Sequence, residues 1–142
     1  MKKYIGIDLG GTNVRVAMVN EAGDVLQIIK EPTGIEKGTD YVLDTIKNMI
    51  RRLDSYEDAC GIGLGVPGPV DTKKGSMILA SNLPGFEGIP IAPILEEEFH
   101  IPTYMDNDAN AAGLEEATQG AGKGYDSVYY VTISTGIGGA FI

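Results

Sequence analysis

Glycines stand at the ends of short apolar runs throughout this chain, and this arrangement limits how it can fold. The sequence has 20 glycines among 142 residues, about twice the usual share. A glycine at the end of an apolar run lets the backbone turn sharply or approach a ligand closely. The pattern therefore predicts short buried strands that end in tight turns or ligand-binding loops.

Charge and cysteine content exclude several classes of function. The chain carries 11 basic and 20 acidic residues, a net charge of −9, so nucleic acid and anionic membranes are poor partners. Cys60 and His100 are the only residues of their types, which leaves no internal disulfide and no zinc cluster. No apolar run is long enough to span a membrane, and Asp8 interrupts the run that a signal peptide needs. We therefore expect a cytoplasmic protein.

Hydrophobic periodicity predicts the order of strands and helices. Three strands with short links form an antiparallel meander over Tyr4–Leu9, Val14–Asn20 and Val25–Lys30. Helical stripes alternate with short apolar strands in the rest of the chain. The predicted helices are Asp40–Leu53, Ile91–Phe99 and Ala109–Gln119, and the predicted strands are Gly61–Val66, Pro102–Met105, Ser127–Ser134 and a last one from Gly138.

This order predicts an α/β fold, a mixed sheet with helices on both faces. The chain stops inside an apolar strand, Gly138–Ile142, and such a strand needs partners. We therefore expect the 142 residues to be the first lobe of a longer protein.

The first motif that suggests chemistry follows the first predicted strand. Gly10 and Gly11 bare backbone N–H groups against which a phosphate can lie, and Thr12 and Asn13 add donors. Asp8 is placed to hold Mg²⁺, usually through water. An ordinary glycine hairpin is the alternative, but it does not need a carboxylate inside an apolar strand, where an unpaired charge is costly.

A second motif repeats this arrangement near the end of the sequence. Thr132–Gly139 reads strand, hydroxyl residues, glycine turn and strand, with Thr135 and Gly136 at the turn. One such turn is weak evidence. Two of them suggest a nucleotide phosphate held between matched loops.

A third motif, Asp106–Asn110, opens the predicted helix from Ala109. Helix capping explains Asp106 or Asn107 but not all four polar residues. An ionised aspartate here could accept a hydroxyl proton during phosphoryl transfer while an asparagine holds a neighbouring hydroxyl. The helix dipole would keep such an aspartate ionised.

Two further loops offer polar groups. Gly63–Gly68 ends a predicted strand in a rigid, proline-containing loop with Asp71 at its end. Ser81–Phe86 combines an amide, a hydroxyl and a rigid apolar turn, which suits a sugar, although an ordinary loop is an equal alternative.

Cys60 is expected to be a small core residue and His100 a helix C-cap or surface residue.

In this order the motifs resemble the ROK family of sugar kinases, within the actin-like ATPase superfamily, over residues 4 to 142. The nearest relatives by pattern are bacterial glucokinases. The two phosphate motifs correspond to Asp8–Arg15 and Thr132–Gly139, the sugar-side loop to Gly65–Asp71, the sugar-binding segment to Asn82–Phe86 and the catalytic segment to Asn107–Asn110. The resemblance implies a ribonuclease H-like lobe over residues 1–142, with a mixed five-stranded sheet, three antiparallel strands and helices on both faces.

The resemblance also implies an activity, ATP-dependent phosphorylation of a hexose, with glucose 6-phosphate as the expected product. Asp108 would be the catalytic base that takes the proton of the sugar 6-hydroxyl. The sugar would be held by Gly68, Asn82, Asn107 and Asp108. The ATP phosphates would be held by Gly10, Gly11, Thr12, Asn13, Thr135 and Gly136, and Mg²⁺ by Asp8.

Three departures from the family pattern bear on this. The chain has about half of the family's length, and the other half is expected to hold the adenosine site, further sugar contacts, a zinc-binding cysteine cluster and much of a homodimer interface. Ser134 stands where a glycine is common. No DNA-binding helix-turn-helix precedes the first strand, so the repressor branch is not expected.

The residues leave other functions open. A non-catalytic sugar-sensing module of a transcriptional regulator would keep the sugar loops and lose the phosphate hairpins. Another actin-like phosphotransferase, such as an acetate or glycerol kinase relative, would lack the Asn82 and Asn107 segments. Fructokinase and N-acetylhexosamine kinase activities share the motifs with glucokinase.

Overall fold

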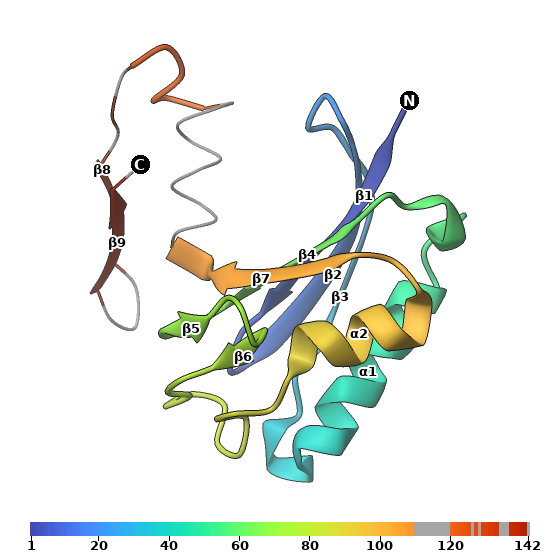
Figure 1. Cartoon of the computed structure of the whole chain (residues 1–142), viewed down its shortest axis with the longest axis vertical. Helices are drawn as coiled ribbons and strands as arrows, with labels where there is room; N and C mark the ends of the chain where they lie inside the picture. The colour runs from blue at the N-terminus through green and yellow to red at the C-terminus, as the bar shows by residue number, and fades with distance from the viewer. Residues whose placement is uncertain (110–119, 126, 128, 134–136, 142) are drawn as a thin grey trace.

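A mixed five-stranded sheet forms the centre of the molecule in a computed structural model (Figure 1), which describes residues 1–109, 120–125, 127, 129–133 and 137–141. The strand order is β3-β2-β1-β4-β7. Pairing is antiparallel between β1 and β2 and between β2 and β3, and parallel from β1 to β4 and from β4 to β7. The strands are β1 (Lys3–Leu9), β2 (Asn13–Asn20), β3 (Val25–Pro32), β4 (Ile62–Val66) and β7 (Thr103–Asn107).

Alternation along each strand creates one apolar face. In β1, Ile5, Ile7 and Leu9 are buried, and the register places Ile7 beside Val16 of β2 and Leu64 of β4. Successive strand residues point to opposite faces, so Gly6 and Asp8 lie on the other face, as the sequence pattern predicted.

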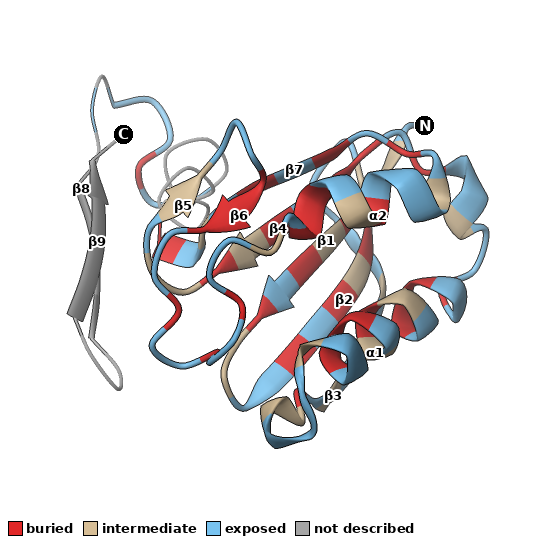
Figure 2. Cartoon of the chain, turned by 60° about the horizontal axis from the view of Figure 1, so that its bottom comes forward, coloured by how far each residue is buried: buried red, intermediate tan, exposed pale blue. Residues whose placement is uncertain are grey.

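Both described α-helices cover the apolar face (Figure 2). Helix α1 (Thr39–Arg51) buries a stripe at helical spacing, Val42, Leu43, Ile46, Met49 and Ile50. Helix α2 (Ile91–Phe99) buries Ile91, Ala92 and Leu95 and ends at His100, which has a left-handed φ of 55°. The C-cap expected for His100 is therefore confirmed. Arg51 of α1 donates to Glu98 of α2 at 2.8 Å, on the solvent side.

Short elements complete the described structure. Two 3-10 turns, η1 (Ile35–Lys37) and η2 (Tyr56–Asp58), flank α1. Strands β5 (Val70–Asp71) and β6 (Ser76–Met77) form a small antiparallel hairpin that the sequence patterns did not predict. Strands β8 (Tyr129–Ile133) and β9 (Ile137–Phe141) pair with each other as a separate two-stranded sheet (Figure 1).

The predicted α/β fold with a mixed five-stranded sheet and an antiparallel β1-β2-β3 meander is confirmed. The helix predicted over Ala109–Gln119 lies almost wholly outside the described residues. The expectation for Cys60 was wrong: its side chain is exposed, because the residue precedes β4 and only its backbone N–H is engaged, donating to Lys3 O at 2.8 Å. Within the described part of the chain, no helix has the length and apolar character needed to cross a bilayer.

Candidate active site

The parallel pairing of β1, β4 and β7 brings three predicted site segments to one edge of the sheet. Carboxyl ends of neighbouring parallel strands meet at the same edge, where ligands of α/β proteins commonly bind. Asp8 near the end of β1 pairs in register with Gly65 of β4, and Gly65 pairs with Asp106 of β7. A Cβ at Gly65 would lie 3.6 Å from Cα of Asp108. The Asp108 segment therefore lies at van der Waals distance from this position of β4, and Asp8 lies beside Gly65 on β1.

Asp8 and Asp108 share one electrostatic environment. Burial of Asp8 raises the pKa of its carboxyl, the negative charge of Asp108 raises it further, and Arg15 partly offsets both by lowering it. Asp8 is an exposed residue. The sheet and the Asp108 segment nevertheless remove part of the hydration of its carboxylate. A carboxylate whose ionisation is disfavoured by burial and by a second negative charge suits a cation nearby.

This donor set fits Mg²⁺ better than a metal that needs a full protein cage. Mg²⁺ usually keeps several waters and takes one or two carboxylates together with substrate phosphates. Among the described residues, no three His, Cys, Asp or Glu side chains gather as a metal cluster. Mg²⁺ at Asp8 stays a prediction.

The Gly10–Asn13 loop turns its carbonyls into the protein. Gly10 N–H donates to Asn13 O at 2.9 Å, and Thr33 N–H donates to Thr12 O at 2.9 Å. Thr33 Oγ1 donates to Gly10 O at 2.7 Å. Within the described residues, the backbone N–H groups of Gly11 and Thr12 donate to nothing. A loop with bonded carbonyls and open N–H groups has the donor arrangement that anion-binding loops use.

The phosphate loop touches the predicted sugar loop. A Cβ at Gly11 would lie 2.8 Å from Asn82 O and 3.0 Å from Asn82 Cβ, so only glycine allows this approach without a shift. The Asn82 side chain is exposed and makes no hydrogen bond within the described residues. The loop that carries Asn82 is anchored by a hydrogen bond, which Ala80 N–H donates to Glu87 Oε1 at 3.2 Å.

A third contact joins the catalytic segment to the Gly68 loop. Asn107 Nδ2 donates to Gly68 O at 2.7 Å, while Asn107 Oδ1 accepts from Ala109 N–H at 2.9 Å. Capping by Asn107, one of the two predicted, is thus confirmed. Gly68 has a φ of +86°, and a Cβ there would lie 2.7 Å from Leu79 O. Glycine is therefore required at this position on two counts.

These contacts bring together eight of the predicted site residues, at the ends of β1 and β7 and on three touching loops. They are Asp8, Gly10, Gly11, Thr12, Gly68, Asn82, Asn107 and Asp108. Asn13 begins β2 at the same edge. Thr135 and Gly136 lie outside the described residues, although the pairing of Thr132 with Gly138 confirms an antiparallel hairpin on either side of them.

Sequence patterns missed two residues of this site, Thr33 and Glu87. Thr33 bonds to backbone groups more than twenty positions away, and Glu87 accepts from the N–H of Ala80 seven positions away. No spacing rule connects either residue to its partner.

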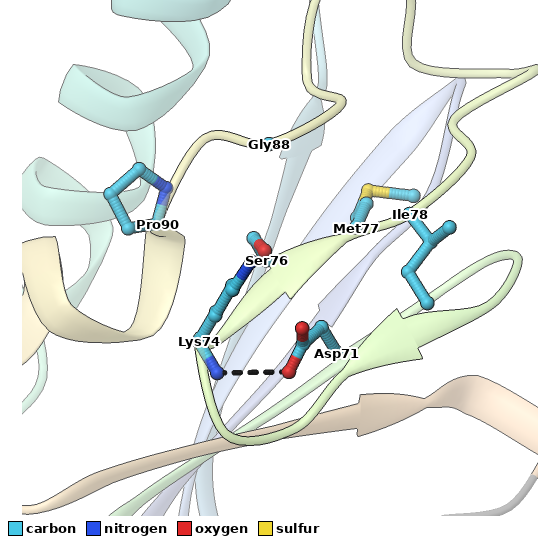
Figure 3. Close-up of a pocket in the computed structure, with 7 residues that line it drawn as sticks. All are labelled: Asp71, Lys74, Ser76, Met77, Ile78, Gly88 and Pro90. Carbon is cyan, nitrogen blue, oxygen red and sulfur yellow. Dashed lines mark hydrogen bonds between the residues drawn. The ribbon is translucent and has the colours of Figure 1, made fainter.

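A separate open pocket of about 520 Å³ lies between the β5-β6 hairpin and the Gly88–Pro90 segment (Figure 3). Asp71 Oδ1 at its rim accepts from Lys74 N–H at 3.1 Å, which closes the turn between the two strands. The predicted sugar-side loop Gly65–Asp71 reaches this pocket through Asp71.

Comparison with known proteins gives a consistent assignment. The model of the ROK family matches residues 4–142. A glucokinase of Thermotoga maritima is 35% identical over 140 residues, which are 99% of this chain and 44% of the relative. A xylose repressor of Caldicellulosiruptor bescii is 30% identical over 97% of this chain and 36% of its own length.

Solved structures agree with the sequence relatives. A ROK hexokinase from Thermus thermophilus superposes with a TM-score of 0.86 at 37% identity, over 99% of this chain and 46% of that one. A ROK family glucokinase from Streptomyces griseus, in complex with glucose and AMPPNP, has a TM-score of 0.88 at 32% identity, over 99% and 44%. The chain spans about half the length of the curated relatives it matches, and it belongs to the ROK family.

Proposed function

We propose that this chain is the N-terminal lobe, residues 1–142, of an ATP-dependent hexose kinase that converts glucose to glucose 6-phosphate. One observation carries the proposal. Two neighbouring carboxylates, the open N–H groups of Gly11 and Thr12 and the unpartnered amide of Asn82 meet at one edge of the sheet. Such a site offers a base, a phosphate cradle and a hydroxyl-binding group within one set of touching loops.

In this mechanism Asp108 accepts the proton of the sugar 6-hydroxyl. The hydroxyl oxygen forms a bond to the γ-phosphorus of ATP, the bond from that phosphorus to the β–γ bridging oxygen breaks, and ADP leaves with the electron pair. Asp108 is exposed and makes no hydrogen bond within the described residues, so its carboxylate is available to orient a nucleophile. Catalysis then rests mainly on positioning and charge stabilisation.

The nucleotide side uses the first loop. Gly11 and Thr12 present N–H groups to the phosphates, and the Thr12 hydroxyl and the Asn13 amide add donors from exposed positions. We assign the second phosphate contact to Thr135 and Gly136 on sequence grounds. Asp8 holds Mg²⁺, usually through water, and the bound ion supplies neutralising charge at the phosphates.

The sugar side uses Asn82, Asn107 and Gly68. Asn82 is free to exchange hydrogen bonds with a sugar hydroxyl. The Asn107 amide already spans Gly68 O and Ala109 N–H. We assign a sugar contact to Asn107 on sequence grounds, while its amide fixes the Gly68 loop.

A sugar-sensing module of a regulator is the second candidate, favoured by the likeness to a xylose repressor. It would bind sugar without turnover. The open N–H groups of the Gly10–Asn13 loop support the kinase, because a sensor that holds only sugar has no use for them.

The test is a coupled assay of the full-length protein with ATP, Mg²⁺ and a panel of glucose, fructose, mannose, allose and N-acetylated hexoses. The kinase proposal expects ADP release that depends on hexose, fastest with glucose. Sugar binding by calorimetry without ADP release on any hexose would contradict it and favour the sensor. Because the site lies where two lobes would close and exclude water, we expect residues 1–142 alone to show little turnover.

A further inference from the structure

Thr33 is a buried polar residue that the proposed mechanism does not use directly. It follows β3 and is fully buried, with 0% of its surface exposed. Its two hydrogen bonds both go to the first phosphate loop, from Oγ1 to Gly10 O at 2.7 Å and from N–H to Thr12 O at 2.9 Å. The residue therefore belongs to the site although it lies more than twenty positions away along the chain.

The hydroxyl contact fixes the direction of one peptide plane. In a trans peptide the C=O of one residue and the N–H of the next point in opposite directions. Since Thr33 Oγ1 draws Gly10 O into the protein, the N–H of Gly11 must point outward. This N–H is one of the two that have no partner within the described residues. Without the hydroxyl, a peptide flanked by two glycines has little to prevent it from rotating.

Thr33 is itself held in place by its neighbours. Gly34 has a φ of +68°, and a Cβ there would lie 2.7 Å from the Tyr41 ring. The chain thus turns sharply after Thr33, against the first residues of α1, and goes into η1. A residue anchored between a strand and a helix makes a rigid support for a glycine loop.

We propose that Thr33 is a positioning residue, which holds the Gly10–Gly11 peptide with its N–H turned toward the nucleotide phosphates. This inference rests on the proposed kinase function. It adds that affinity for ATP, and not for the sugar, depends on a hydroxyl that never touches either substrate.

The test compares Thr33→Val, which removes the hydroxyl at nearly constant volume, with Thr33→Ser, which keeps it. In the full-length protein we expect Thr33→Val to raise KM for ATP about five- to ten-fold, the effect of losing one buried hydrogen bond. KM for glucose should change less than two-fold, and Thr33→Ser should restore most of the ATP affinity. Amide hydrogen exchange of Gly11, measured without nucleotide, should be altered in Thr33→Val alone.

Thr103→Val is the matched control. Thr103 is also buried, and its Oγ1 donates to Ile101 O at 3.0 Å, at the end of β7 away from the loop. The substitution removes an equivalent bond, so it should lower stability without changing KM for ATP.

The outcomes separate the two proposals. An unchanged KM for ATP in Thr33→Val, or equal rises in KM for both substrates, would overturn the role of Thr33. Equal loss of ATP affinity in Thr103→Val would also overturn it, because the effect would then be one of general stability. If the unmodified protein does not turn over, the kinase proposal fails, and the amide exchange of Gly11 alone decides whether Thr33 holds the loop.

Discussion

The apolar face of the sheet and the edge at which β1, β4 and β7 end satisfy opposite requirements. This edge, with the loops that follow the strands, is called the loop edge below. Under α1 and α2 the side chains are packed and buried, and no buried side-chain nitrogen or oxygen among the described residues lacks a partner. At the loop edge, Asp8 lies near a second carboxylate. Within the described residues, the Asn82 amide and the N–H groups of Gly11 and Thr12 make no hydrogen bond. The core stabilises the fold, whereas the edge leaves polar groups open to solvent or to a ligand.

This contrast predicts that substitutions in the two regions affect different properties. At the edge, activity should change more than stability. In the core, stability should change while the chemistry of folded molecules does not.

The largest effect is expected at Asp108. Asp108→Asn removes the proposed proton acceptor and should lower kcat of the full-length protein by about 10²–10⁴-fold. The unfolding free energy should stay the same or rise, because the charge beside Asp8 is lost. Steady-state kinetics and urea titration measure the two quantities. The control is Asp44→Asn on the exposed side of α1, and turnover of Asp108→Asn equal to that control would remove the assignment.

In the core, Ile46→Ala should lower the unfolding free energy by about 2–5 kcal/mol, since it leaves a cavity at a fully buried position of α1. Turnover per folded molecule should remain near that of the unmodified protein at a temperature where both are folded. Thermal and urea unfolding give the stability. A large fall in kcat without a loss of stability would show that core and edge are not separable.

The contact between the two loops depends on the absence of a side chain at Gly11. Gly11→Ala would place a Cβ 2.8 Å from Asn82 O and displace one loop. We expect kcat/KM to fall about ten- to a hundred-fold, with both ATP and glucose affected because the contact joins their loops. Gly6→Ala is the matched control in β1, where an added Cβ meets nothing within 4 Å. Equal kinetics for the two variants would show that the loop contact is unimportant.

The smallest effect concerns Asp8 and its dependence on pH. The folded state raises the pKa of Asp8, so it binds the proton more tightly than the unfolded chain, and stability falls as pH rises through the window between the two values. Asp8→Asn removes this cost and should be the more stable protein at neutral pH. The difference should shrink toward about pH 4.

Urea titration at both pH values measures the stability difference. In the full-length enzyme the same variant should need more Mg²⁺ for half-maximal turnover. Greater stability of the unmodified protein at neutral pH would contradict the direction of the pKa shift.

Sequence periodicity was sufficient for the elements that form one face of the core. The alternation of Ile5, Ile7 and Leu9 predicted β1 and its buried face, and the stripe from Val42 to Leu53 predicted α1, because burial imposes the period of each element on the sequence. Asp8 was predicted to be a site residue because a charge inside an apolar strand is costly unless it is paired.

Other features left no local trace. Strands β5 and β6 have two residues each, too few to show alternation. Thr33 appears in the sequence as one polar residue of a loop after Pro32, and its burial follows only from the path of the chain between β3 and α1. Cys60 resembled a core residue because it stands next to an apolar run, but side-chain direction at a strand start depends on the register.

The sequence by itself determined the strands of the five-stranded sheet, helices α1 and α2 and the kinds of chemical group at each loop, because local periodicity and glycine placement are properties of neighbouring residues. Tertiary structure decided which loops touch. Parallel pairing of β1, β4 and β7 brings Asp8 and Asp108 to either side of Gly65. Similarly, Thr33 fixes a loop that precedes it by a whole hairpin. Such contacts join segments that are distant along the chain, and only the folded sheet defines their separation.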